Sequence, residues 1–346
     1  MPQNHSQEHV PRHRFRKGII CLKGIQEFIK KNNGFLYVLP SFLLLVLFSL
    51  IPLCMTGYFS FTEYSVLKPP VWIGLDNYKS MAGDPFFRPA IRNTVIYTLV
   101  TVPIQTVLSL VIANLLASRF RGKLGNFFKS TLFIPVISSM VLVGTVWKFM
   151  LATEGGIINN ILALVGIGKV NWLGRYNLAL ISVSIVAIWK NVGYFLVIYY
   201  AGLMDVPRSH YEAAKVDGAS SLQQFFYITV PALKPITYLV VTLGTIWSFQ
   251  VFDLVYTMTG GGPGTATITM VMSIYQSGFK QYKMGYASAM AFVLFLIVIL
   301  ISILQKKVFS GKGGEEKWKR KYSLSSGPRR FSLQCLHWLP CSRSSI

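Results

Sequence analysis

Charged residues are scarce in this chain, and acidic ones most of all. Only 13% of its 346 residues are charged, with 12 Asp and Glu against 34 Lys and Arg. Hydrophobic residues make up 52% of the chain, and the mean hydropathy is +0.48. Because soluble domains carry about 25% charged residues, this balance excludes an ordinary soluble protein. The sequence is that of an integral membrane protein.

Patterns for catalysis, metal binding and cofactor binding are also lacking. The four cysteines, Cys21, Cys54, Cys335 and Cys341, are too few and too scattered for a disulfide framework. Cys335, His337 and Cys341 are a conceivable set of metal ligands, but their spacing matches no standard site. The glycine-rich stretch Thr259–Thr267 lacks the lysine of a phosphate-binding loop. We expect no catalytic residue, metal or cofactor in this chain. If the protein uses ATP, another chain must bind it.

The positive charge collects at the two ends. A net charge of +22 in a soluble protein would indicate nucleic-acid binding. Here the cations precede the first long apolar run and follow the last: Arg12, Arg14, Arg16, Lys17, Lys23, Lys30, Lys31, then Lys306, Lys307, Lys312, Lys317, Lys319, Arg320 and Lys321. This distribution fits contact with anionic lipid and retention in the cytoplasm. We expect a lipid bilayer as partner and no nucleic acid.

Long apolar runs dominate the region between these ends. A bilayer core of about 30 Å needs about 20 apolar residues in a helix. Six runs are long enough: Phe35–Phe59, Ala90–Leu116, Ser130–Leu151, Leu178–Leu203, Ile236–Met258 and Met284–Val308. A further patch, Thr267–Tyr275, is too short to span and is expected to lie at an interface or to re-enter the membrane.

These runs predict an all-α integral membrane fold. Six transmembrane helices occupy residues 34–309, between a basic cytoplasmic segment at 1–33 and a basic, disordered tail at 310–346. The Lys and Arg bias of the short loops places both termini in the cytoplasm. A cytoplasmic loop then lies between the fourth and fifth spans.

This loop carries the signals of two short helices. Ser209 stands three residues before Glu212, the spacing of a capping box, so the first helix is predicted to begin near His210. Gly218 can end it in the left-handed conformation.

A second N-cap is predicted directly after Gly218. Ser220 or Ser221 would cap this helix, with Gln223 or Gln224 as the residue three positions on, and Pro231 and Pro235 are expected to stop it. On local physics two interpretations stay open. The loop is a simple turn, or it docks into another protein and transmits movement to the spans.

The loop resembles a known motif, the EAA loop in the membrane subunits of ATP-binding-cassette importers. The matching residues are Glu212, Ala213, Ala214, Asp217, Gly218, Ala219, Phe225, Pro231 and Pro235. Three other stretches are similar to the sugar-permease branch of that family, the maltose and glycerol-phosphate type: Trp72–Tyr78, Ala201–Ala214 and Phe252–Thr267. The resemblance covers roughly Phe35–Phe309.

The resemblance implies a MetI-like transmembrane domain in the cell membrane that imports a carbohydrate. Its implied partners are a second homologous permease subunit, a cytoplasmic ATPase dimer that binds the ATP, and an extracellular solute-binding protein. The residues implied to contact the ATPase are Glu212, Ala213, Ala214, Asp217, Gly218 and Ala219.

Polar residues within the spans are candidates for the substrate path: Lys190, Asn191, Tyr194, Gln250 and Asp253, with Trp247 and Tyr256 as further sugar contacts. Lys190 and Asp253 either pair, line the path or lie near an interface, and the aromatic and amide side chains also suit helix packing.

The alternative function is an ion-gradient-driven transporter of a small polar solute, which would favour the carboxylates and histidines that these spans almost lack. A lipid-modifying enzyme would need clustered His, Asp or Glu at one interface.

Overall fold

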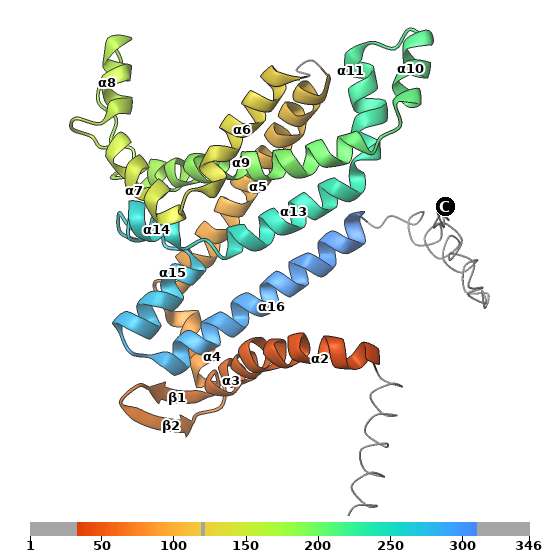
Figure 1. The fold of residues 1–346 in the computed structure, drawn as a ribbon. Helices are drawn as coiled ribbons and strands as arrows, with labels where there is room; N and C mark the ends of the chain where they lie inside the picture. The colour runs from red at the N-terminus through yellow and green to blue at the C-terminus, as the bar shows by residue number, and fades with distance from the viewer. Residues whose placement is uncertain (1–32, 119–121, 310–346) are drawn as a thin grey trace, which may run out of the picture. The chain divides into compact units, whose positions relative to one another are not determined.

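The computed structural model describes residues 33–118 and 122–309, and these are mostly helical (Figure 1). The predicted basic segment at 1–33, except for Asn33, and the predicted tail at 310–346 lie outside them, as does the set Cys335, His337 and Cys341. The described chain divides into two compact units. Residues 33–83 and 274–292 form the first, and residues 84–273 and 293–309 form the second.

The first unit contains an exposed apolar helix followed by a small hairpin. Helix α2 (Asn33–Leu45), a π-helical turn η1 (Val46–Leu50) and α3 (Ile51–Phe59) form one long helix, and no side chain in its most apolar window is buried within the chain. Such a surface is suited to lipid or to another subunit.

Antiparallel strands β1 (Thr62–Ser65) and β2 (Lys68–Trp72) precede α4 (Asp76–Gly83). This hairpin is not predicted from the sequence, because Pro69 and Pro70 disfavour a strand. The amide of Asn77 in α4 holds it, donating to the carbonyls of Ser60 and Thr62 at 2.9 Å each.

The second unit is built on two long helices, α5 (Phe87–Ser118) and α9 (Tyr176–Met204), which pack along each other and against α13 (Lys234–Phe249). One cluster of its apolar core is formed by the buried residues Leu110, Ala113, Leu116, Phe195, Leu196, Tyr199, Leu203, Leu233 and Val240. Polar pairs also cross between the helices. Thr101 and Ser248 share a hydrogen bond of 3.1 Å, and Asn191 donates to Gln105 at 3.3 Å. Such contacts are typical of membrane helices, where small and polar groups hold neighbours together.

The third predicted span is bent, not straight. Helix α6 (Lys123–Ile137) and helix α7 (Met140–Met150) meet at 98°. Ser138 and Ser139 between them have extended ψ angles of 143° and 140°, which interrupts the helical hydrogen bonds. Pro135, which has no N–H, already weakens the last turn of α6.

The fifth predicted span ends early, at Phe249 instead of Met258. The chain leaves the helix at Gln250, and α14 (Asp253–Met258) is a separate short helix. Four helices are long and apolar enough to cross a membrane, and six spans result if each bent helix pair counts as one. The all-α class is confirmed, with the hairpin as an addition.

The short apolar patch at 267–275 is packed inside the second unit up to Ser273. Thr267, Ile268, Thr269 and Met270 are all buried. Asn93 of α5 donates to the carbonyls of Thr265 at 2.7 Å and Ile268 at 3.0 Å. The chain continues through α15 (Met270–Tyr275) and η3 (Gln276–Lys280) to the last helix, α16 (Met284–Phe309).

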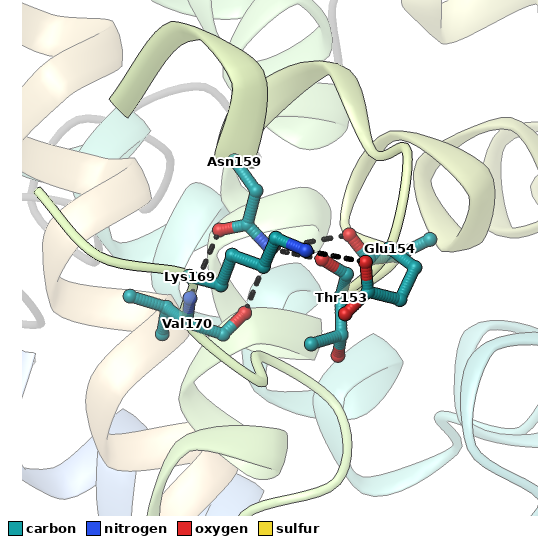
Figure 2. A network of polar contacts seen from close by, with 6 residues as sticks. Thr153, Glu154, Asn159, Lys169 and Val170 are labelled. Atoms are coloured by element: carbon teal, nitrogen blue, oxygen red, sulfur yellow. Dashed lines mark hydrogen bonds and ion pairs between the residues drawn. The ribbon is translucent and has the colours of Figure 1, made fainter. Parts of the chain in front are cut away.

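The connection between α7 and α9 is held by one buried amide (Figure 2). Asn159 of α8 (Ile157–Leu164) donates to the carbonyls of Ala152, Thr153 and Val170 at 3.2, 3.3 and 2.9 Å. Its oxygen accepts from the Val170 N–H at 3.2 Å and from Trp172 Nε1 at 3.1 Å. The ion pair between Lys169 and Glu154, with its atoms 2.5 Å apart, lies on the exposed side of the same loop.

We predict that Asn159→Leu loosens this loop, while Lys169→Gln does not. The leucine leaves the two donors of Val170 and Trp172 without an acceptor, at about 1–3 kcal/mol for each group that stays out of water. Loss of the exposed ion pair costs about 0–1 kcal/mol. Hydrogen exchange of the loop amides should be at least tenfold faster in Asn159→Leu and nearly unchanged in Lys169→Gln. Equal exchange in the two variants would contradict this account.

Candidate functional site

A pair of short helices lies between α9 and α13, as predicted. Helix α10 (Arg208–Val216) is followed by α11 (Ser221–Gln224), η2 (Phe225–Thr229) and α12 (Val230–Ala232), and Figure 1 shows α10 and α11 joined by a tight turn. The turn is made at Gly218, whose φ is +80°. Gly218 N–H donates to Lys215 at 3.1 Å and Ala219 N–H to Ala214 at 2.8 Å, which satisfies two carbonyls at the end of α10.

Only the second of the two predicted capping boxes is formed. Ser220 Oγ accepts from Gln223 N–H at 3.3 Å, and the Gln223 side chain accepts from Ser220 N–H at 2.7 Å. The capping box predicted at Ser209 and Glu212 is not formed. Pro207 occupies the N-cap position with φ −59° and ψ 129°, so the helix begins at Arg208 and Ser209 already lies within its first turn.

The predicted stop at Pro231 and Pro235 falls between the two prolines, and Pro235 lies in the first turn of the next span, α13. The helix continues through the π-helical turn η2, and Pro231 lies at the start of α12. The break comes at Leu233, where the chain bends by 70° into α13. A hydrogen bond of 3.0 Å between Tyr211 and Thr229 ties α10 to η2, so the helix pair is one braced unit.

The tip of this unit is open to solvent. Glu212, Ala213, Asp217 and Gly218 are exposed, while Ala214 and Ala219 are half-buried. Large apolar side chains flank the tip: Val216, Leu222, Phe226 and Tyr227 are also exposed. A capped, braced helix pair with carboxylates and apolar side chains at its tip has the properties of a docking surface.

A small cavity of about 120 Å³ lies in the second unit. Its lining comes from α5, α7, α9 and the break between α13 and α14: Tyr97, Met140, Asn191, Trp247, Ser248, Gln250, Val251, Phe252, Asp253 and Leu254. The lining combines aromatic rings, amides, a hydroxyl and one carboxylate, which is the chemistry that binds a polar, uncharged ring.

Three of the five path residues predicted from the sequence meet at this cavity, namely Asn191, Gln250 and Asp253. Tyr194 does not line it but packs against Trp247, with ring centres 4.9 Å apart. Lys190 does not line the cavity either; its ammonium donates to the Val136 carbonyl at the end of α6, at 3.4 Å. Within the described chain no ion pair joins Lys190 to Asp253, so that suggested pairing is wrong.

Tyr97 and Ser248 are lining residues that the sequence reasoning missed. The available signal was a polar stripe along α5 at helical spacing, in which Thr94, Thr98, Thr101 and Gln105 are all buried. Among residues 33–118 and 122–309, no three His, Cys, Asp or Glu side chains gather to form a metal site.

Comparison with known proteins decides the family. Residues 80–311 match the family described as the binding-protein-dependent transport system inner membrane component. The chain belongs to this family. It is therefore the permease subunit of an ATP-binding-cassette importer and not an enzyme, since hydrolysis of ATP belongs to a separate subunit.

Curated relatives agree over most of the chain. The probable ABC transporter permease protein YurN of Bacillus subtilis is 35% identical over 286 residues, covering 82% of this chain and 97% of the relative. The sulfoquinovosyl glycerol transport system permease protein SmoG of Agrobacterium fabrum is 34% identical, covering 80% and 90%. The lactose transport system permease protein LacF of Rhizobium radiobacter is 33% identical, covering 79% and 92%.

The permease fold is also found in a solved structure. A bacterial ABC transporter involved in the import of the acidic polysaccharide alginate matches with a TM-score of 0.75 and 20% identity, covering 84% of this chain and 99% of that one. The resemblance proposed from the EAA-type loop is thus confirmed for family and fold.

We predict that Ser220→Ala frays the second helix of the loop, while Ser209→Ala does not. Loss of an N-cap hydroxyl costs about 0.5–2 kcal/mol, whereas Ser209 makes no capping hydrogen bond in α10. Hydrogen exchange at residues 221–224 should accelerate several-fold in Ser220→Ala only. Faster hydrogen exchange at the start of α10 in Ser209→Ala would contradict this account and support the capping box predicted from the sequence at Ser209.

Proposed function

We propose that this permease moves a carbohydrate across the membrane through the cavity at the α13–α14 break. The observation that carries the proposal is the set of side chains there. Trp247 and Tyr97 contribute aromatic rings, and Asn191, Gln250 and Asp253 contribute hydrogen-bonding groups for the hydroxyls of a sugar. The names of relatives support a sugar, since SmoG, LacF and the AraP proteins are named for sulfoquinovosyl glycerol, lactose and arabinooligosaccharides.

The size of the cavity supports movement during transport. About 120 Å³ is well below the roughly 300–1,000 Å³ of ligand sites in general. A sugar therefore enters only when the surrounding helices separate. In an alternating-access cycle this separation occurs on one side of the membrane at a time.

The helix pair α10–α11 is the proposed contact with the ATPase. Glu212, Ala213, Ala214, Asp217, Gly218 and Ala219 form its tip and the flank of α10. Because capping and the Tyr211–Thr229 bond brace the helix pair, force applied at the tip passes to η2 and α13 without being lost in local bending. We propose that the ATPase subunit binds the ATP and that this chain carries no cofactor.

The complete transporter is proposed to contain two homologous permease subunits, a cytoplasmic ATPase dimer and an extracellular solute-binding protein. An alginate importer has been solved with a pentasaccharide-bound periplasmic protein, which supports a binding protein here. The unburied apolar surface of α2 and α3 leaves room for a second permease subunit or lipid. We propose that the chain crosses the membrane six times, with both termini on the cytoplasmic side together with the α10–α11 loop.

We predict that Gly218→Val uncouples transport from ATP hydrolysis, whereas Gly166→Val does not. The two glycines are a matched pair: their φ angles are +80° and +77°, and each ends a short helix, α10 or α8, with the same hydrogen-bond pattern. A β-branched residue at positive φ costs about 1–2 kcal/mol at either site.

Only Gly218 lies at the proposed ATPase contact. In liposomes containing the whole transporter, Gly218→Val should lower sugar uptake per ATP at least tenfold or release the ATPase on purification. Equal sugar uptake per ATP in the two variants would show that the α10–α11 loop does not couple transport to ATP hydrolysis.

We predict that Gln250→Ala raises the sugar concentration for half-maximal uptake. Loss of one hydrogen bond to a bound hydroxyl is worth about 0.5–1.5 kcal/mol, or a two- to tenfold change. The matched control is Asn160→Ala, which removes an exposed amide from α8, outside the cavity lining. The measurement is the rate of uptake at varied sugar concentration. An unchanged concentration for half-maximal uptake in Gln250→Ala would exclude this residue from the sugar path.

A further inference from the structure

Lys190 is a buried charge that the proposed sugar path leaves unexplained. It lies in the middle of α9, only 8% exposed, and does not line the cavity. A charged side chain inside a span is costly, and such residues face the protein interior and pair with other charges or with backbone carbonyls. The partner of Lys190 is a carbonyl, that of Val136 at 3.4 Å.

This carbonyl has lost its helical partner. In a continuous helix the Val136 carbonyl would accept from the N–H of residue 140, but Ser138 and Ser139 are extended and α7 leaves at 98°. The Lys190 ammonium supplies the missing donor. Its positive charge also suits the C-terminal end of α6, where the helix dipole is negative.

Neighbouring residues of α9 contact both halves of the bent span. Trp189 packs edge to face on Trp147 of α7, with ring centres 5.4 Å apart. Gly193, one turn after Lys190, lies so close to α6 that a Cβ there would overlap the Leu132 carbonyl. Because residues four apart share a face of a helix, one face of α9 contacts both α6 and α7.

The bend in turn places part of the cavity wall. Met140, the first residue of α7, lines the cavity. Further along, Gly144 packs directly against Thr257 and Leu254 of α14, the helix that begins at Asp253. A change in the α6–α7 angle would therefore move Met140 and the support of α14 together.

We propose that Lys190 is a positioning residue. Its ammonium replaces the missing backbone donor at Val136 and, with Trp189, fixes the α6–α7 bend that holds Met140 in the cavity wall. This role is separate from sugar binding and does not depend on the identity of the substrate. The nearly isosteric Lys190→Met removes the donor, and Lys190→Arg retains it.

The test measures the bend directly. Spin labels at exposed Phe127 on α6 and Phe149 on α7, in the full-length chain with its four cysteines replaced by serine, report the distance between the two halves in nanodiscs. Lys190→Met should shift the distance distribution to longer values, because the span straightens, and Lys190→Arg should return it to that of the unmutated chain. An unchanged distribution in Lys190→Met, or a failure of Lys190→Arg to restore it, would overturn the proposal.

A second variant covers the case in which Lys190→Met does not reach the membrane. Trp189→Leu keeps the ammonium but removes the contact with α7. It should produce a shift in the same direction between the same two labels. A distribution identical to that of the unmutated chain would show that α9 does not fix the bend.

Discussion

A membrane span must satisfy its own backbone hydrogen bonds, and this constraint decides how the second unit is built. Helices do so unaided, so every point where the chain stops being helical at membrane depth needs a partner from elsewhere in the protein. The structure supplies these partners with side chains. Lys190 donates to Val136 at the α6–α7 break, Thr269 donates to Val251 at 3.0 Å after α13, and Asn93 donates to the carbonyls of Thr265 and Ile268.

The same breaks make a polar cavity possible. Met140 follows the first break, and Gln250, Val251 and Phe252 form the second, so part of the cavity lining comes from places where the chain leaves a helix. The second interruption brings Gln250 and Asp253 to the cavity, where Tyr97 of α5, Asn191 of α9 and Trp247 of α13 complete its polar and aromatic lining.

Sequence reasoning reached the class, the family and the order of spans, because hydrophobic run length and the loop motif are local signals. It also found Gly218 and a capping box directly after it, with Ser220 and Ser221 as the two candidate N-caps, because one glycine and one three-residue spacing determine the geometry there. It failed where distant segments decide the outcome. The α6–α7 bend depends on Lys190 from another helix, and the pairing of Lys190 with Asp253 was suggested by charge alone, without knowledge of which face each occupies.

The central claim is that this chain is the membrane path of an ATP-driven sugar importer. The most direct measurement is uptake of labelled sugar into liposomes that contain the permease, its homologous partner and the ATPase, with and without ATP and the binding protein. The account predicts uptake only when both ATP and the binding protein are present, unaffected by ionophores that collapse ion gradients. Uptake driven by an ion gradient in the absence of ATP would contradict it.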